Sequence, residues 1–241
     1  MVQLINPGAW FGVGSGPLII GENKVIFTPE AFVRLTSYLA THDLPAGLGD
    51  WESACSIAAI NIAISGRLSD DIPACMSMVI GKWIVVIQDA MPDAIRNSPD
   101  WKALLPLAAG TGRKLEEQRT AIALAWMWDV VLPQLQPTAD VEGFGPEWRR
   151  MCVKKTRVAA ANAAYKICTV APFSYSTSFH AAASHAANAA CPSPWDKPYT
   201  TVESALALAV DSASAAAPDR VGFWATVNPC AVLRMMIEVT E

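Results

Sequence analysis

The stretch from Gly110 to Lys114 holds residue types that could bind an anion. Thr111, Gly112, Arg113 and Lys114 stand directly before the charged run LEEQR. Backbone N–H groups at the start of a helix lack partners within the helix, so they attract phosphate or carboxylate, and nearby cations strengthen that attraction. The pattern predicts an anion-binding site at these four residues, with Arg96 or Arg119 assisting.

A nucleotide-type phosphate loop does not fit this stretch. Such a loop needs four residues between its glycines and a Lys-Ser/Thr pair after them. Here a single residue separates Gly110 from Gly112, and no strand is expected before them. The alternative interpretation is structural, with Thr111 capping a helix and Gly112 easing the turn.

A second candidate is the basic segment WRRMCVKKTR. Arg150, Lys154 and Arg157 fall on one helical stripe, and Trp148 is nearby. These four residues form a predicted interaction site for an acidic partner or a phosphate backbone. A solvated helix face has the same pattern, so both interpretations stay open.

Histidines and cysteines give no metal-binding spacing. His180 and His185 are five residues apart, whereas two ligands on one helix face would be four apart. Cys168 and Cys191 flank them in sequence and could approach them only after folding. No GxSxG nucleophile motif is present. We therefore expect no metal, no cofactor and no catalytic residues.

The composition favours a protein with covered apolar surface. Hydrophobic residues make up 52% of the 241 residues and charged residues only 17%, against a usual value of about 25%. Either the core is unusually large or a partner covers apolar surface, which predicts a protein partner or a homo-oligomer. The net charge of −4 argues against general nucleic-acid binding, which usually needs a basic face.

The sequence also bears on the compartment. None of the six cysteines forms a CxxC pair, and most have apolar neighbours, as buried free thiols do. This pattern suits a reducing compartment and predicts a cytoplasmic protein. The first residues lack a basic segment followed by an apolar one, so no signal peptide is expected. The most apolar run is interrupted by Lys82, so no membrane span is expected.

Helical signals dominate the rest of the chain. We expect residues 1–27 to be irregular, with a small hairpin around Gly21, and residues 28–241 to form a single α-helical domain. That domain should be a bundle of roughly eight helices. Expected helix starts are Thr28-Pro29, Asp50, Ser98-Pro99 and Pro146, and the last of these helices should run to about Val170. The helix beginning at Gly112 should be ended by Pro133 and Pro137.

The chain resembles a group of uncharacterised bacterial and phage proteins. The resemblance is carried by DIPACMSMVIGKWIVVIQDAMPDAIRN, by LLPLAAGTG, by EEQRTAIALAWMWDVVLP and by an alanine-rich tail that ends in WATVNPCAVLRMMIEV. It implies a helical fold and a bacterial or phage origin, and it assigns no catalytic residue.

Together these features predict a non-enzymatic protein-interaction or assembly protein. The alternative is an enzyme or sensor that binds a small anionic ligand at the Thr111–Lys114 helix start. Trp126 and Trp128 lie two residues apart and should therefore point to different sides of one helix. We expect one of them in the core and the other toward a second contact.

Overall fold

The computed structural model describes residues 26–170, 176–190 and 202–240. Within these ranges the chain is helical, and its only β pairing is an isolated bridge between Gly49 and Ala54. The predicted mainly α fold is therefore confirmed. The helices are α1 (Pro29–Thr41), α2 (Ser56–Ser65), α3 (Met78–Ala90), α4 (Asp93–Arg96), α5 (Pro99–Ala109), α6 (Glu116–Trp126), α7 (Gln136–Val141), α8 (Gly145–Lys154), α9 (Arg157–Val170), α10 (Ser176–Ala190), α11 (Val202–Ala216), α12 (Arg220–Val227) and α13 (Pro229–Glu238).

Two details of the predicted fold differ from this outcome. The expected number of roughly eight helices is too low, because the helix expected from Pro146 to Val170 is divided and the described chain contains short helices such as α4 and α12. The expected hairpin lies outside the described residues except for its last two, which are not in a strand. In the described ranges, no helix combines the length and the apolar character needed to cross a membrane.

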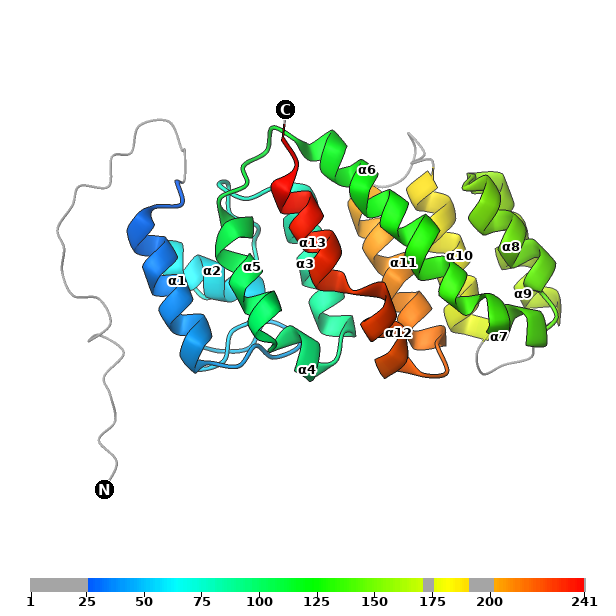
Figure 1. The fold of residues 1–241 in the computed structure, drawn as a ribbon, viewed down its shortest axis with the longest axis horizontal. Coiled ribbons are helices and arrows are strands. Elements are labelled where there is room, and N and C mark those ends of the chain that lie inside the picture. Colours follow the sequence, from blue (N-terminus) through cyan, green and yellow to red (C-terminus); the bar gives the residue numbers. More distant parts are fainter. Residues whose placement is uncertain (1–25, 171–175, 191–201, 241) are drawn as a thin grey trace, which may run out of the picture.

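The helices form an elongated stack (Figure 1). At one end of the long axis lies α1, and at the other lie α8 and α9. The C-terminal helix α13 lies between α5 and α6 in the middle of the molecule and also contacts α3. Buried apolar side chains from α1 through α13 form one continuous core.

Side-chain caps decide several of the helix starts. Thr28 Oγ1 accepts a hydrogen bond from Ala31 N at 3.2 Å, and Ser98 Oγ accepts one from Trp101 N at 3.2 Å. Each cap is followed by a proline at the first helical position, which is pre-organised for the helix, so both predicted starts are confirmed. The predicted start at Asp50 is wrong, because Asp50 closes a local turn by accepting from Glu52 N and Ser53 N.

The segment after α6 continues as helical turns past Pro133 and Pro137, the two prolines that were expected to end the helix. Residues Met127–Val131 form a π-helical turn and Leu132–Leu135 a 3₁₀ turn that leads into α7. Pro133 is tolerated because it stands at the start of the 3₁₀ turn, where its missing N–H costs little. Trp126 and Trp128 are both buried, since α11 and α13 pack against α6 and α11 also packs against the π-helical turn.

The helix expected from Pro146 to Val170 is in fact two helices. Lys155 ends α8 in the left-handed conformation, with φ of 51°, and its N–H donates to Met151 O at 2.8 Å. The chain then reverses, so that α9 packs against α8. A left-handed residue after the last turn is a common helix ending.

A tryptophan cluster joins the helices at the centre of the core. The ring of Trp83 lies 6.1 Å from that of Trp101 and 5.7 Å from that of Trp126, centroid to centroid. Trp101 Nε1 donates to Ser56 Oγ at 3.1 Å, and Trp126 Nε1 donates to Val227 O at 2.7 Å. These contacts link α2, α3, α5, α6 and the end of α12.

Beyond the tryptophan cluster, α9, α10 and α11 pack through alanine. Their fully buried positions include Ala160, Ala163, Ala182, Ala183, Ala186, Ala207, Ala209 and Ala213. Small side chains let helix backbones approach closely. This part of the molecule is therefore held by close helix contact in place of large interlocking side chains.

Candidate functional site

The predicted anion site lies in a loop, not at a helix start. Residues Thr111–Lys114 connect α5 to α6, and α6 begins only at Glu116. Thr111 Oγ1 donates to Ala108 O at 2.7 Å and accepts from Ser77 N at 3.0 Å. Gly112 has a φ of +59° and its N–H donates to Cys75 O at 2.8 Å. The hydrogen-bonding groups of the loop thus have partners within the chain. The helix starts at Glu116, after the four predicted residues.

Arg113 and Lys114, the two cations of that prediction, are both exposed. Arg113 Nε donates to Met76 O at 3.4 Å. Both lie before the first residue of α6, Glu116, and the N-cap residue of that helix, Leu115, makes no side-chain cap.

An anion does occupy a nearby helix N-terminus, and it is the carboxylate of Glu116. Glu116 accepts from Ser77 Oγ at 2.5 Å and from Met78 N at 2.7 Å, both at the start of α3. Ser77 Oγ in turn accepts from Ile80 N at 3.2 Å. The first turn of α3 is therefore capped from a distant part of the sequence, and its donors are satisfied within the chain.

Replacing Glu116 with alanine is expected to lower the free energy of unfolding by about 1–2 kcal/mol, the usual cost of losing a helix cap. Urea denaturation followed by circular dichroism measures the change. Glu117→Ala is the matched control, because Glu117 is the exposed neighbour of Glu116 on the same helix. Equal stability of the two variants would contradict the capping role.

The two arginines expected to assist anion binding are both buried. Arg119 donates to Thr111 O at 3.0 Å, to Gly112 O at 2.8 Å and to Met236 O at 3.1 Å. Burial lowers the pKa of Arg119, and the nearby Glu116 carboxylate opposes that shift. The guanidinium thus ties the end of α13 to the loop between α5 and α6.

Arg96 has the same kind of environment on the other side of the stack. It donates to Leu44 O at 2.8 Å, to Gln88 O at 2.7 Å and to Met91 O at 3.1 Å, and it is ion-paired with Asp93. Backbone carbonyls after a helix end need donors. Both guanidinium groups therefore hold separate segments of the fold together through backbone carbonyls.

The predicted interaction residue Trp148 is a core residue. Its side chain is fully buried, and its Nε1 donates to Leu132 O at 2.9 Å. Its ring packs edge-on against Phe144 and against Phe179 of α10. Trp148 therefore does not share the surface of the three predicted cations, because the apolar side of α8 faces the stack.

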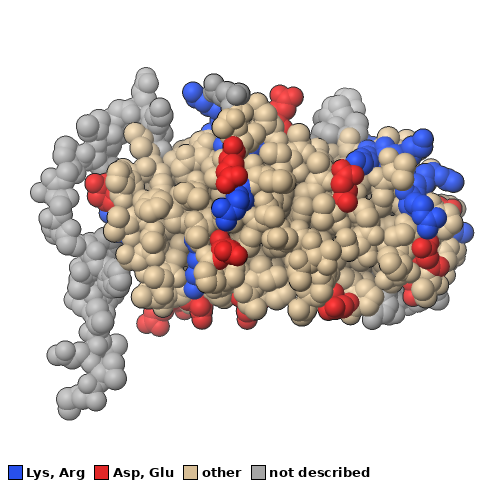
Figure 2. Space-filling view, viewed as in Figure 1, with Lys and Arg blue, Asp and Glu red and all other residues tan. Residues whose placement is uncertain are grey.

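The other residues of that prediction lie on the surface. Arg150, Lys154 and Arg157 are exposed at the end of the molecule where α8 and α9 lie, and Figure 2 shows basic side chains gathered there. Arg149 is ion-paired with Asp140 at 3.2 Å, and Lys155 with Asp129 at 2.5 Å.

Large apolar side chains are exposed beside these cations. Val153 on α8 and Val158 and Tyr165 on α9 each expose 70% or more of their surface. Arginine and tyrosine are enriched where proteins bind one another. We call this surface the α8–α9 end, and it consists of Arg150, Val153, Lys154, Val158 and Tyr165.

The opposite end of the stack also exposes large apolar residues. We use the name α1 end for exposed residues of α1 and of the loop that follows it, namely Phe32, Val33, Leu48, Asp50, Trp51 and Glu52. Trp51 exposes 55% of its surface and Val33 63%. Sequence analysis did not single out these residues, because a tryptophan or valine is expected in the core unless the neighbouring elements are known.

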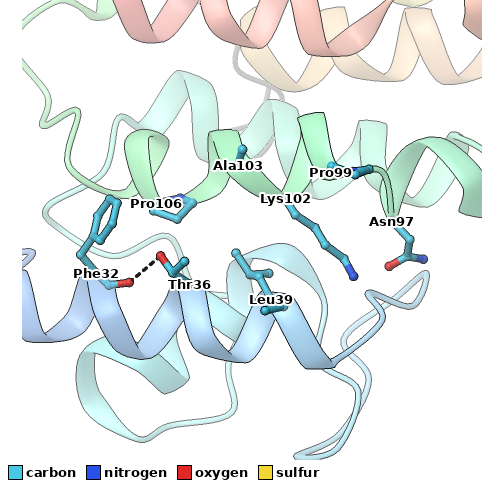
Figure 3. Close-up of a pocket in the computed structure, with 9 residues that line it drawn as sticks. Phe32, Thr36, Leu39, Asn97, Pro99, Lys102, Ala103 and Pro106 are labelled. Carbon is cyan, nitrogen blue, oxygen red and sulfur yellow. Dashed lines mark hydrogen bonds between the residues drawn. The ribbon is translucent and has the colours of Figure 1, made fainter.

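A groove of about 500 Å³ lies between α1 and α5, next to the α1 end. Figure 3 shows Phe32, Thr36 and Leu39 on one side and Lys102, Ala103 and Pro106 on the other. Thr36 Oγ1 donates to Phe32 O at 2.9 Å, and Lys102 Nζ donates to His42 O at 2.9 Å. Since these polar groups already have partners, the groove offers mainly apolar surface.

The candidate metal ligands do not gather. Among the residues that the structure describes, no group of three or more His, Cys, Asp and Glu side chains is placed to hold a metal. Cys168 is exposed on α9, and Cys191 lies outside the described residues. Burial lowers the pKa of His185 on α10, and nearby Asp211 opposes the shift.

Cys55, Cys75 and Cys152 are free thiols of low reactivity. Burial raises the pKa of Cys152 to about 12, and it also raises the pKa of Cys55 and of Cys75. A thiol is a nucleophile only as the thiolate. These three cysteines are therefore protonated at neutral pH and suit packing better than catalysis.

Comparison of the chain with protein-family profiles, with curated protein sequences and with solved structures finds no match. The predicted resemblance to bacterial and phage proteins stays a prediction, and function has to be argued from the surface of the molecule.

Proposed function

We propose that this chain is a non-enzymatic assembly protein that works by binding other protein chains through the two ends of its helix stack. The supporting observation is where large apolar residues are exposed. Nine of the twelve such residues in the described ranges lie within residues 26–51 or 141–165, about a quarter of the described chain. The nine are Ile26, Phe32, Val33, Leu48, Trp51, Val141, Val153, Val158 and Tyr165.

The terminal helices of a stack have faces that no neighbouring helix covers. An inner helix is covered on two sides, but a terminal helix has one face without a neighbour, and stacked proteins that stay monomeric make that face polar. Here α1 and α9 carry exposed valine, phenylalanine and tyrosine at those ends. Covering these side chains with another protein removes apolar surface from water, which favours association.

Light scattering and native mass spectrometry of the purified full chain over a wide concentration range test the proposal. We expect a mass of more than one chain that grows with concentration. A bare monomer at every concentration would contradict it. The predicted cytoplasmic location and bacterial or phage origin are further parts of this proposal.

A further inference from the structure

The two ends of the molecule differ in charge. At the α1 end, Asp50 and Glu52 are acidic and none of the six residues is basic. At the α8–α9 end, Arg150 and Lys154 are basic and none of the five residues is acidic. In Figure 2 the basic side chains gather over α8, whereas acidic side chains line the lower edge of the half that holds α1.

We infer that the partner of each end is a second copy of this chain, bound head to tail, with the α8–α9 end of one copy on the α1 end of the next. This inference rests on the proposed function and names its partner. Opposite charges then face each other, while Tyr165 and Val158 of one copy cover Trp51 and Val33 of the next.

The charges also argue against symmetric pairing. Two α8–α9 ends brought together place basic beside basic, and two α1 ends place acidic beside acidic, and such like-charge contacts oppose binding. Contact between unlike ends leaves one unused end on each copy. Such an interface is heterologous, so it adds copies until a ring closes or a filament grows.

Because an interface of this kind has two different halves, two blocked variants should complement each other. Val158→Ser with Tyr165→Ser blocks the α8–α9 end, and Val33→Ser with Trp51→Ser blocks the α1 end. All four side chains are more than half exposed, so the fold tolerates the changes. We expect each double variant alone to lose every species above the monomer.

A mixture of the two variants tests head-to-tail binding directly. Each retains one intact end, and these intact ends fit each other, so light scattering should show a 1:1 dimer and nothing larger. The control is Val221→Ser with Met235→Ser, which changes exposed apolar residues on α12 and α13, away from both ends, and should assemble like the wild type.

Salt supplies an independent readout. At about 1 M ionic strength the screening length falls to about 3 Å, so we expect the wild-type assembly to weaken as salt is raised, with the loss mainly in the association rate. Assembly that strengthens with salt would show that apolar contact alone drives it and would overturn the charge pairing.

The possible failures separate the two proposals. Suppose that the wild type assembles but a blocked variant still dimerises alone, or the mixture of variants stays monomeric. Either result overturns head-to-tail binding and leaves the proposal of an assembly protein standing. A wild type that never assembles overturns both.

Discussion

Replacing Arg119 with alanine is expected to lower the free energy of unfolding by about 3–5 kcal/mol, since a buried group left without its hydrogen-bond partner costs about 1–3 kcal/mol. The change removes the donors of three backbone carbonyls, those of Thr111, Gly112 and Met236. It also frees the end of α13, which contacts α3, α5 and α6. Urea denaturation followed by tryptophan fluorescence measures the loss.

The control for this prediction is Arg149→Ala. Arg149 pairs with Asp140 on the surface, and exposed pairs of this kind contribute about 0–1 kcal/mol. Arg119→Lys should recover part of the stability, because an ammonium keeps the charge but lacks the planar fork that reaches several carbonyls. If Arg119→Ala is no less stable than Arg149→Ala, the tie between α13 and the α5–α6 loop does not hold the fold.

Replacing Trp148 with alanine should lower the free energy of unfolding by about 3–5 kcal/mol, the usual cost of removing a buried aromatic side chain. The indole packs edge-on against Phe144 and Phe179, whose rings also contact each other, and it donates to Leu132 O. Trp148→Phe keeps a ring at this position but loses the hydrogen bond and part of the indole volume, so its loss should be smaller, about 1–2 kcal/mol.

The same measurement separates a core role from an interaction role for Trp148. The comparison is Trp51→Ala, which removes an exposed indole from the α1 end and should leave unfolding within about 0.5 kcal/mol of wild type. A stable Trp148→Ala chain that has lost its assembly would instead restore the interaction role that the sequence indicated.

Local signals predicted the parts of the fold that depend on neighbouring residues. Thr28 and Ser98, each followed by proline, mark true helix starts, and Gly66 ends α2 in the left-handed conformation. At Asp50 the same reasoning failed, because an aspartate can equally close a turn of its own. Cys55, a weak cap that sequence reasoning passes over, begins α2 instead.

The candidate site depended on contacts between distant residues, which periodicity does not reveal. Glu116 reaches back 39 positions to Ser77, and Arg119 reaches forward 117 positions to Met236. The sequence predicted a ligand anion at Thr111–Lys114, whereas the carboxylate of Glu116 lies at the start of α3. The sequence could not indicate that the helix is α3 and the anion a side chain of the same protein.

The exposed ends were beyond sequence reasoning for a related reason. The low share of charged residues predicted that some apolar surface would need a cover, but only the order of helices along the stack places that surface. Val158 and Tyr165 belong to an alanine-rich helix that is apolar on several sides, so the pattern alone does not separate its inner face from its outer one.

The alanine packing of α9, α10 and α11 has a consequence for the response of the molecule to temperature. Alanine loses no rotamer freedom when it is buried, so these helices become ordered at low entropic cost. They also bury little apolar area per residue, and the heat capacity of unfolding follows that area. The tryptophan-rich half around Trp83 therefore carries most of the curvature of the stability curve. On cooling, that half loses hydrophobic stabilisation faster than the alanine half, because its larger side chains bury more apolar area.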